Sequence, residues 1–288
     1  NPWNSITVPT LHGSREKART NIIGHRFLDL SIWSLPYLIR EYSFILLDDN
    51  KKLKDSFESI ISNIINPSAN HEDRQRFNTR YQVFFSDLFA TYFMGPSYPC
   101  SIIFKYANPF SRRIKDNPND EERVFIIINM LKKLNTQQAD FISPPLAPLI
   151  EMLEKNWNVT LNEIYQDGKY YTERIAPQIQ NDLCHLTDDI HKLFIRHLIA
   201  AIGYPVNAKS EGWMIAQDWY LEWEKQLKER REISKTPSFD YTSKLRDVFN
   251  AAWLCRLNNP DYANSIADAA LSLCEEIITS QRQYTGIS

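Results

Sequence analysis

The chain has 288 residues, of which 43% are hydrophobic, and it contains 7 Trp, 14 Tyr and 15 Phe. This is enough apolar material for a continuous core in one large domain. Its 33 basic and 35 acidic side chains give a net charge of −2, so no excess of one sign is present to attract phosphate backbones or an anionic lipid surface. We therefore do not favour a nucleic-acid partner and expect no membrane partner.

The four cysteines are far apart in the sequence and include no C-x-x-C pair; they are Cys100, Cys184, Cys255 and Cys274. Their spacing argues against a zinc ribbon, a redox pair and a secreted disulfide framework. The apolar runs are much shorter than the roughly 20 residues of a membrane-spanning helix, and no basic-then-apolar leader is visible. We expect a cytoplasmic protein.

Few glycines and many prolines, 7 and 15, punctuate the chain. Apolar residues recur at three- and four-residue spacing almost everywhere, which indicates helices joined by short proline-marked turns. Pro36 predicts the start or a kink of a helix, and Asp48 and Asp49 mark that helix's end. The helix before it would hold His25 and Asp29.

Three further helices are predicted downstream. The clearest covers about residues 72–94 and stops at Gly95 and Pro96. A second begins near Asn117 and Pro118, where asparagine can cap and proline suits the first turn. A third covers residues 181–202 and ends at Gly203.

Residues 143–148, with the sequence S-P-P-L-A-P, are the densest group of helix breakers and the most plausible place for a hinge. No internal repeat or heptad pattern stands out. The expected fold is mainly α: a multi-helix single domain over residues 1–288, or two closely packed helical halves that meet near residues 143–148.

Residues 81–110 begin Y-Q-V-F-F-S-D-L-F-A and pass through Gly-Pro into a second apolar segment. They resemble bacterial helical zincin-like metallopeptidase-like proteins, in which an E-x-x-A/S-D-L-x-A helix ending in Gly-Pro follows an earlier H-E-x-x-H helix. On that pattern His25 is kept, Arg26 replaces the glutamate base, and Asp29 replaces the second histidine. Val83 replaces the glutamate of the third ligand, while Asp87 is kept.

These replacements change the chemistry that the resemblance implies. An arginine stays protonated at neutral pH and cannot act as a general base, and a valine cannot ligate a metal. We therefore expect a non-catalytic, zincin-like pseudoenzyme without a cofactor, acting as a scaffold or protein-interaction module with a protein partner. The alternative is a hydrolase whose divalent metal is held by His25, Asp29 and Asp87, with Arg26 stabilising an anionic intermediate.

A third alternative comes from Arg19 and His25, whose spacing resembles that of helical ribonucleases of the HEPN type. Such enzymes place the motif at a dimer interface so that two copies face one RNA phosphate. The sequence contains one such arginine–histidine pair, so this alternative requires two copies of the chain to form the site.

Two other groups admit a functional or a structural interpretation. Asp182, His185 and Asp189 share one face of the predicted 181–202 helix and suit metal binding or acid–base work, but Lys192 and Arg196 on the same face favour a solvated surface with ion pairs. His197 is expected in the core or at an interface. Aromatic residues also cluster in the C-terminal part, where helical spacing favours a core and exposure would favour an interaction surface; they are Trp213, Trp219, Tyr220 and Trp223.

Overall fold

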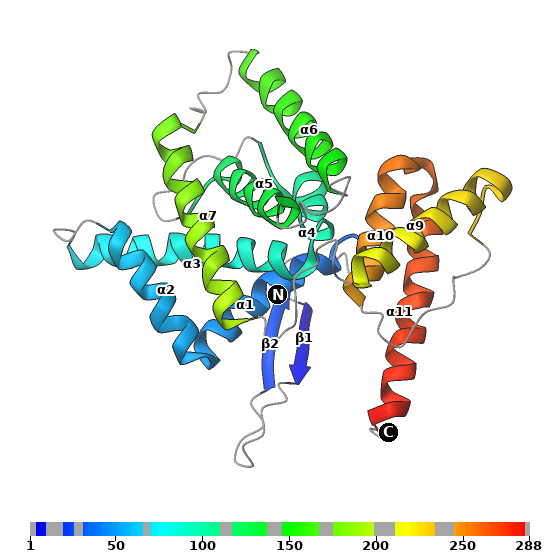
Figure 1. The fold of residues 1–288 in the computed structure, drawn as a ribbon, viewed down its shortest axis with the longest axis horizontal. Helices are drawn as coiled ribbons and strands as arrows, with labels where there is room; N and C mark the ends of the chain where they lie inside the picture. Colours follow the sequence, from blue (N-terminus) through cyan, green and yellow to red (C-terminus); the bar gives the residue numbers. More distant parts are fainter. Residues whose placement is uncertain are drawn as a thin grey trace.

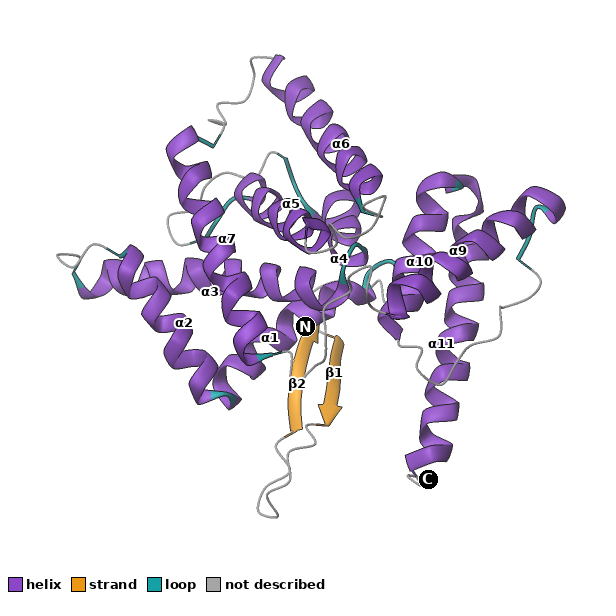
Figure 2. Cartoon of the chain, viewed as in Figure 1, coloured by secondary structure: helices purple, strands orange, loops and turns teal. Residues whose placement is uncertain are grey.

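A computed structural model describes residues 4–9, 20–25, 31–65, 70–109, 117–136, 146–166, 175–198, 211–233 and 245–285. In this part of the chain helices dominate, which confirms the expected mainly α fold (Figure 2). The α-helices are α1 (Leu35–Asp49), α2 (Lys51–Ile64), α3 (His71–Met94), α4 (Ser97–Ser101), α5 (Asp120–Thr136), α6 (Ala147–Gln166), α7 (Pro177–His197), α9 (Glu211–Arg230), α10 (Leu245–Asn258) and α11 (Ala263–Thr285).

Two strands form an antiparallel hairpin near the start of the chain. Strand β1 (Asn4–Pro9) pairs with β2 (Thr20–His25), so that Asn4 lies opposite His25. The helix expected around His25 is therefore wrong at this residue. The β-branched Thr20, Ile22 and Ile23 and the flexible Gly24 favour extended backbone over helix.

The central element of the N-terminal part is α3, on which α1, α5 and α7 pack, while α2 packs on α7 (Figure 1). The middle of α3 is buried on every side, and Phe84, Phe85, Leu88 and Phe89 are inaccessible to solvent. The helix ends at Gly95, whose φ of 67° suits a residue without Cβ. Both the helix predicted at residues 72–94 and its glycine stop are confirmed.

The start of α5 differs slightly from the prediction. The side chain of Asn119 accepts a hydrogen bond from the Glu122 amide at 2.8 Å, and the Glu122 carboxylate accepts one from the Asn119 amide at 3.2 Å. This reciprocal capping box fixes the helix start. The helix expected from Asn117 thus begins at Asp120, because Asn119 is the residue that caps it.

The other predicted boundaries hold in part. The turn preceding α1 leads into Pro36 in the helix's first turn, and α1 ends at Asp49, as expected. Helix α7 begins at Pro177, earlier than predicted, because proline is well suited to a first helical turn. Helix α7 ends at His197, with Leu198 at its C-cap, which is earlier than the predicted end at residue 202. The expected stop at Gly203 lies outside the described residues.

The segment expected as a hinge lies between α5 and α6. Residues 143–145 are outside the described part of the chain, and α6 begins at Ala147. Both α6 and α7 pack on α5. A hinge at residues 143–148 stays a prediction.

The C-terminal helices α9, α10 and α11 lie together on one side of the molecule (Figure 1), with α9 and α11 both packed on α10. Trp219 and Trp223 are buried, at 2% and 0% exposure, so the core interpretation is confirmed for these two tryptophans. Tyr220 is partly buried against the core, and the side chain of Trp213 lies outside the described part of the structure. Helix α10 contacts α4, which is followed by a short π-helix, η1 (Ile102–Tyr106); a 3₁₀-helix, η2 (Pro260–Tyr262), precedes α11. None of the described helices has the length and apolar character that crossing a membrane requires.

Candidate functional site

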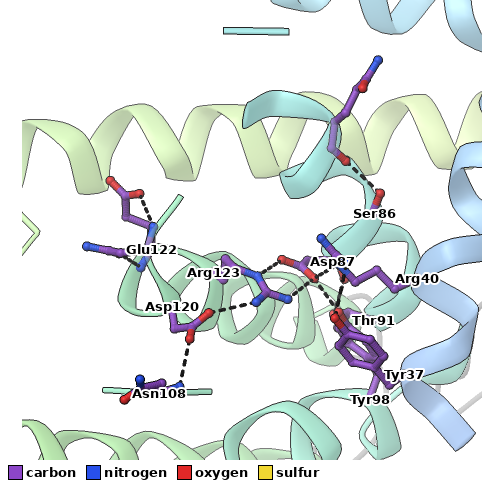
Figure 3. Close-up of polar contacts among 12 residues, drawn as sticks. Tyr37, Arg40, Ser86, Asp87, Thr91, Tyr98, Asn108, Asp120, Glu122 and Arg123 are labelled. Atoms are coloured by element: carbon purple, nitrogen blue, oxygen red, sulfur yellow. Dashed lines mark hydrogen bonds and ion pairs between the residues drawn. The ribbon is translucent and has the colours of Figure 1, made fainter. Parts of the chain in front are cut away.

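The strongest concentration of buried charge surrounds Asp87, the acidic residue that the zincin-like resemblance singles out. Asp87 lies in the buried middle of α3, and its side chain is completely inaccessible. Four helices supply the group: Arg40 comes from α1, Tyr98 from α4 and Arg123 from α5 (Figure 3). The site therefore ties together the helices at the centre of the N-terminal part.

Both carboxylate oxygens of Asp87 accept hydrogen bonds. Arg123 donates from Nε to Oδ2 at 2.7 Å and from Nη2 to Oδ1 at 3.0 Å, which is the bidentate arrangement that arginine favours. Oδ1 also accepts from Arg40 Nε at 3.1 Å and from the Tyr98 hydroxyl at 2.5 Å. Such saturation is what a buried carboxylate needs in order to stay charged.

Two further carboxylates pair with these arginines at the edge of the cluster. Asp120 accepts from Arg123 Nη1 at 2.8 Å and from the backbone amide of Asn108 at 2.9 Å. Glu41 accepts from Arg40 Nη1 at 2.9 Å. Two guanidinium groups thus meet three carboxylates, of which Asp120 and Glu41 are partly exposed. The cluster is a network of ion pairs that connects α1, α3 and α5.

Aromatic side chains enclose the Arg40 guanidinium. Its central carbon lies 5.8 Å from the ring centre of Tyr37 and 6.0 Å from that of Phe44, distances that allow cation–π attraction. Tyr37 also packs on Tyr106 of η1, with ring centres 4.7 Å apart. Arg40 is therefore held by packing as well as by charge.

The ionisation states follow from competition between burial and charge. Burial by itself would raise the pKa of Asp87, but the positive charges of Arg123 and Arg40 and the hydrogen bonds to the carboxylate outweigh it, so this pKa lies below its ordinary value. Burial, followed by the negative charge of Asp87, raises the pKa of the Tyr98 hydroxyl well above its ordinary value. Tyr98 consequently remains a donor and Asp87 an anionic acceptor.

This arrangement limits what Asp87 can do chemically. A divalent cation at its carboxylate would lie beside two guanidinium groups, and a substrate proton could reach it only by displacing an arginine or the Tyr98 hydroxyl. Among the residues that the structure describes, no group of three or more His, Cys, Asp and Glu side chains is placed to hold a metal ion. What the geometry offers at Asp87 is a rigid connection between helices.

The other residues of the predicted site are placed only in part. The backbone of His25 ends strand β2, while its side chain, Arg26 and Asp29 lie outside the described residues, as does Arg19. A site formed by His25, Asp29 and Asp87 therefore stays a prediction.

The predicted α7 group behaves as a solvated face. Asp182, His185 and Asp189 are exposed, and Asp189 pairs with Lys192 at 3.4 Å. The ion-pair interpretation is confirmed at that position. His197 accepts or donates a hydrogen bond at 3.3 Å with the Ser56 hydroxyl of α2, which places it at the α2–α7 interface, as expected.

Arg40, Tyr98 and Arg123 were not predicted as site residues from the sequence. Two of these three residues, Arg40 and Arg123, nevertheless stand in sequence patterns that indicate a buried charge. Arg40 stands inside the apolar run L-P-Y-L-I-R-E-Y-S-F-I-L-L, and Arg123 directly precedes V-F-I-I-I. A cation within the apolar stripe of a helix indicates a buried partner, since an unpaired buried charge is prohibitively costly.

Comparisons with protein-family models, with curated proteins and with solved structures find no match for this chain.

Proposed function

We propose that the protein is a non-catalytic helical scaffold that binds a partner protein, built on a zincin-like framework that has lost its hydrolytic groups. The observation that carries this proposal is the state of Asp87. Its carboxylate is buried, anionic and bonded to Arg40, Arg123 and Tyr98, so it stabilises the helix packing and is not free to bind a metal or accept a proton.

The surface offers a plausible anchor for a protein partner at Phe104. This residue of the π-helix η1 is 42% exposed, yet its ring stacks on the buried Trp253 at a centroid distance of 6.2 Å. A partly exposed aromatic ring held rigid by packing can bury large area in a complex at a small entropic cost. Irregular π-helical turns also occur often at functional positions.

The metal-dependent hydrolase would need Asp87 to leave its ion pairs. Titration of zinc and manganese into purified protein, with metal content measured by mass spectrometry, separates the two proposals. The scaffold predicts no stoichiometric metal in the wild type and no change in metal content in His25→Ala. Tight, stoichiometric metal that is lost in His25→Ala would support the hydrolase. No observation on the described residues favours the ribonuclease alternative.

Partner binding is tested by affinity selection followed by reconstitution with the purified candidate. Phe104→Ser should weaken the reconstituted complex at least tenfold, a loss of about 1.4 kcal/mol in binding free energy. Leu221→Ser is the matched control, because Leu221 is even more exposed, at 56%, but lies on α9. Equal effects of the two substitutions, or none, would count against Phe104 as an anchor.

A further inference from the structure

A cavity of about 220 Å³ lies between α5, α6 and the start of α7. Helices α6 and α7 both pack on α5 (Figure 1), which forms the cavity floor. The α5 residues at the cavity follow one helical stripe, and the α6 residues follow another. The cavity is thus built from facing helix surfaces rather than from loops.

Polar and apolar residues both line the cavity, and the apolar ones come from α5, from α6 and from the segment that leads into α7. Val124 and Ile128 of α5 face Trp157 and Leu161 of α6, and Ile175 closes the side next to α7. Each of these five side chains is less than 9% exposed. The cavity volume is close to the volume of one large apolar amino acid. A small apolar molecule can therefore fill the cavity without displacing the helices.

One end of the cavity carries both signs of charge. Lys132 of α5 and Glu154 of α6 line it, and their side chains pair across the gap at 2.5 Å. Both remain more than a third exposed, so water screens this pair and its strength is small. A ligand with its own ammonium and carboxylate can exchange this pair for two charge-assisted contacts.

The opposite end is already closed. Glu121, which also lines the cavity, accepts a hydrogen bond from the Ile175 amide at 3.4 Å, and Gln180 donates to the Ile175 carbonyl at 3.2 Å. Glu121 and Lys132 are separated by about 16 Å along α5, given a rise of 1.5 Å per residue. The lining residues at the Glu121 end are therefore held by hydrogen bonds to one another, away from the Lys132–Glu154 pair.

A second cavity, of about 250 Å³, adjoins the mouth. It shares Asn129 and Lys132 with the first and is also lined by Lys133, Cys184 and Asp188. Lys133 and Asp188 form an ion pair there. The Asn129 amide and Lys132 therefore lie between the two spaces.

We propose that the cavity between α5 and α6 binds a small zwitterion with an apolar side chain, of the class of the apolar α-amino acids. Lys132 binds its carboxylate, Glu154 binds its ammonium group, and its side chain enters the space between Ile128, Trp157 and Leu161. This inference is independent of the proposed scaffold function, since ligand binding needs no partner protein.

The test is isothermal titration calorimetry of the full chain with L-leucine, L-phenylalanine and L-tryptophan. Isoamylamine lacks the carboxylate of leucine, 4-methylpentanoic acid lacks its ammonium group, and glycine lacks its side chain. Saturable binding of at least one apolar amino acid, at least tenfold tighter than each of these three analogues, is the expected result. No binding at about 10 mM, or equal binding of a singly charged analogue, would overturn the proposal.

Variants locate the site. Lys132→Gln and Glu154→Gln should each weaken binding at least tenfold while leaving the thermal melt unchanged, because both residues are exposed. Lys192→Gln, an exposed lysine of α7 that pairs with Asp189, is the matched control and should bind like the wild type. If Lys192→Gln weakens binding as much as Lys132→Gln does, the ligand is held elsewhere or by charge alone, and the assignment fails.

Discussion

Arg123 and Asp87 form a bidentate ion pair, with Nε 2.7 Å from Oδ2 and Nη2 3.0 Å from Oδ1. The pair joins α5 to α3, and the Asp87 side chain is completely buried. Removing one member of such a pair leaves the other charge buried without compensation, which costs far more than a surface pair contributes. The stability of the helical core is therefore coupled to these two residues.

Replacing Arg123 by methionine should destabilise the fold strongly. Arg123→Met retains an unbranched side chain but leaves Asp87 without its bidentate partner, and we expect a loss of about 3–5 kcal/mol in the free energy of unfolding. Urea denaturation followed by circular dichroism measures it. Lys192→Met, which removes an exposed pair, should cost less than about 1 kcal/mol; similar losses in both variants would show that burial of the Asp87 pair has no special weight.

The Tyr98 hydroxyl should contribute measurably on its own. Tyr98→Phe keeps the ring in its buried place and removes only the donor to Asp87, so we expect a loss of about 1.5–3 kcal/mol, the range for hydrogen bonds to charged groups. Tyr220→Phe is a suitable comparison, because the Tyr220 hydroxyl is only partly buried; it accepts from the exposed Asn258 at 3.0 Å and also bonds to Glu224. This replacement should cost less, since water can satisfy the partners that remain. A neutral Tyr98→Phe substitution would mean that the Asp87 carboxylate is satisfied without it.

Lowering the pH should remove the contribution of Asp87 to the free energy of unfolding. Its pKa in the folded protein lies below the ordinary value of 3.8, so the stabilisation is fully present above the pKa of the unfolded chain and is lost as the pH falls through the lower folded value. The free energy of unfolding of the wild type should accordingly drop below about pH 4. In Arg40→Met, which weakens the depression of that pKa, the drop should be smaller and should be complete at a higher pH, because the folded pKa lies closer to the unchanged pKa of the unfolded chain. Identical acid profiles would contradict the assignment.

The fold was predictable where one segment determines its own structure. Helix α3 and its glycine stop follow from a local apolar pattern and a residue that accepts positive φ, and α1 follows from its proline. The Asp87 network does not, because its partners lie 47, 36 and 11 residues away in the sequence. Only the packing of four helices brings them together, and no local periodicity encodes which arginine meets which carboxylate.

The strand at residues 20–25 ends at His25, which was mispredicted as helical although the local sequence favours extended backbone. The helical interpretation of His25 came from the zincin-like resemblance, whereas the local residues T-N-I-I-G-H are poor helix formers. Pairing with β1 then determines the outcome. Where a short motif and the local backbone preferences disagreed, the backbone preferences prevailed, and His25 does not lie on the helix that was expected to carry it together with Asp29.

His191 should make the protein more stable at neutral than at mildly acidic pH. It is buried against Tyr92, with ring centres 6.0 Å apart. Burial and the charge of Lys133 lower its pKa below 6.5, although Asp188 acts in the opposite direction. The neutral ring is thus favoured in the folded state, and the associated stability, fully present above the unfolded pKa of about 6.5, is lost as the pH falls through the lower folded value.

The variant His191→Phe keeps an aromatic ring on Tyr92 but cannot titrate. Its free energy of unfolding should therefore change less than that of the wild type between about pH 7 and pH 5. Chemical denaturation at a series of pH values provides the comparison. Parallel profiles for the two proteins would show that His191 does not titrate differently in the folded and unfolded states.

Arg256 should link the C-terminal helices to the start of α1. Its guanidinium carbon lies 4.5 Å from the ring centre of Trp33 and 5.0 Å from that of Trp253, and the two rings meet edge to face at 5.2 Å. Arg256→Met keeps the aliphatic contact and removes the cation, so we expect a loss of about 1–2 kcal/mol from two partly buried cation–π contacts. Lys is the informative second replacement, because it restores charge without the planar group that stacks on indole. Partial recovery in Arg256→Lys, with a matching shift in tryptophan fluorescence, is expected, whereas wild-type stability in Arg256→Met would show that α10 is held to Trp33 by apolar packing alone.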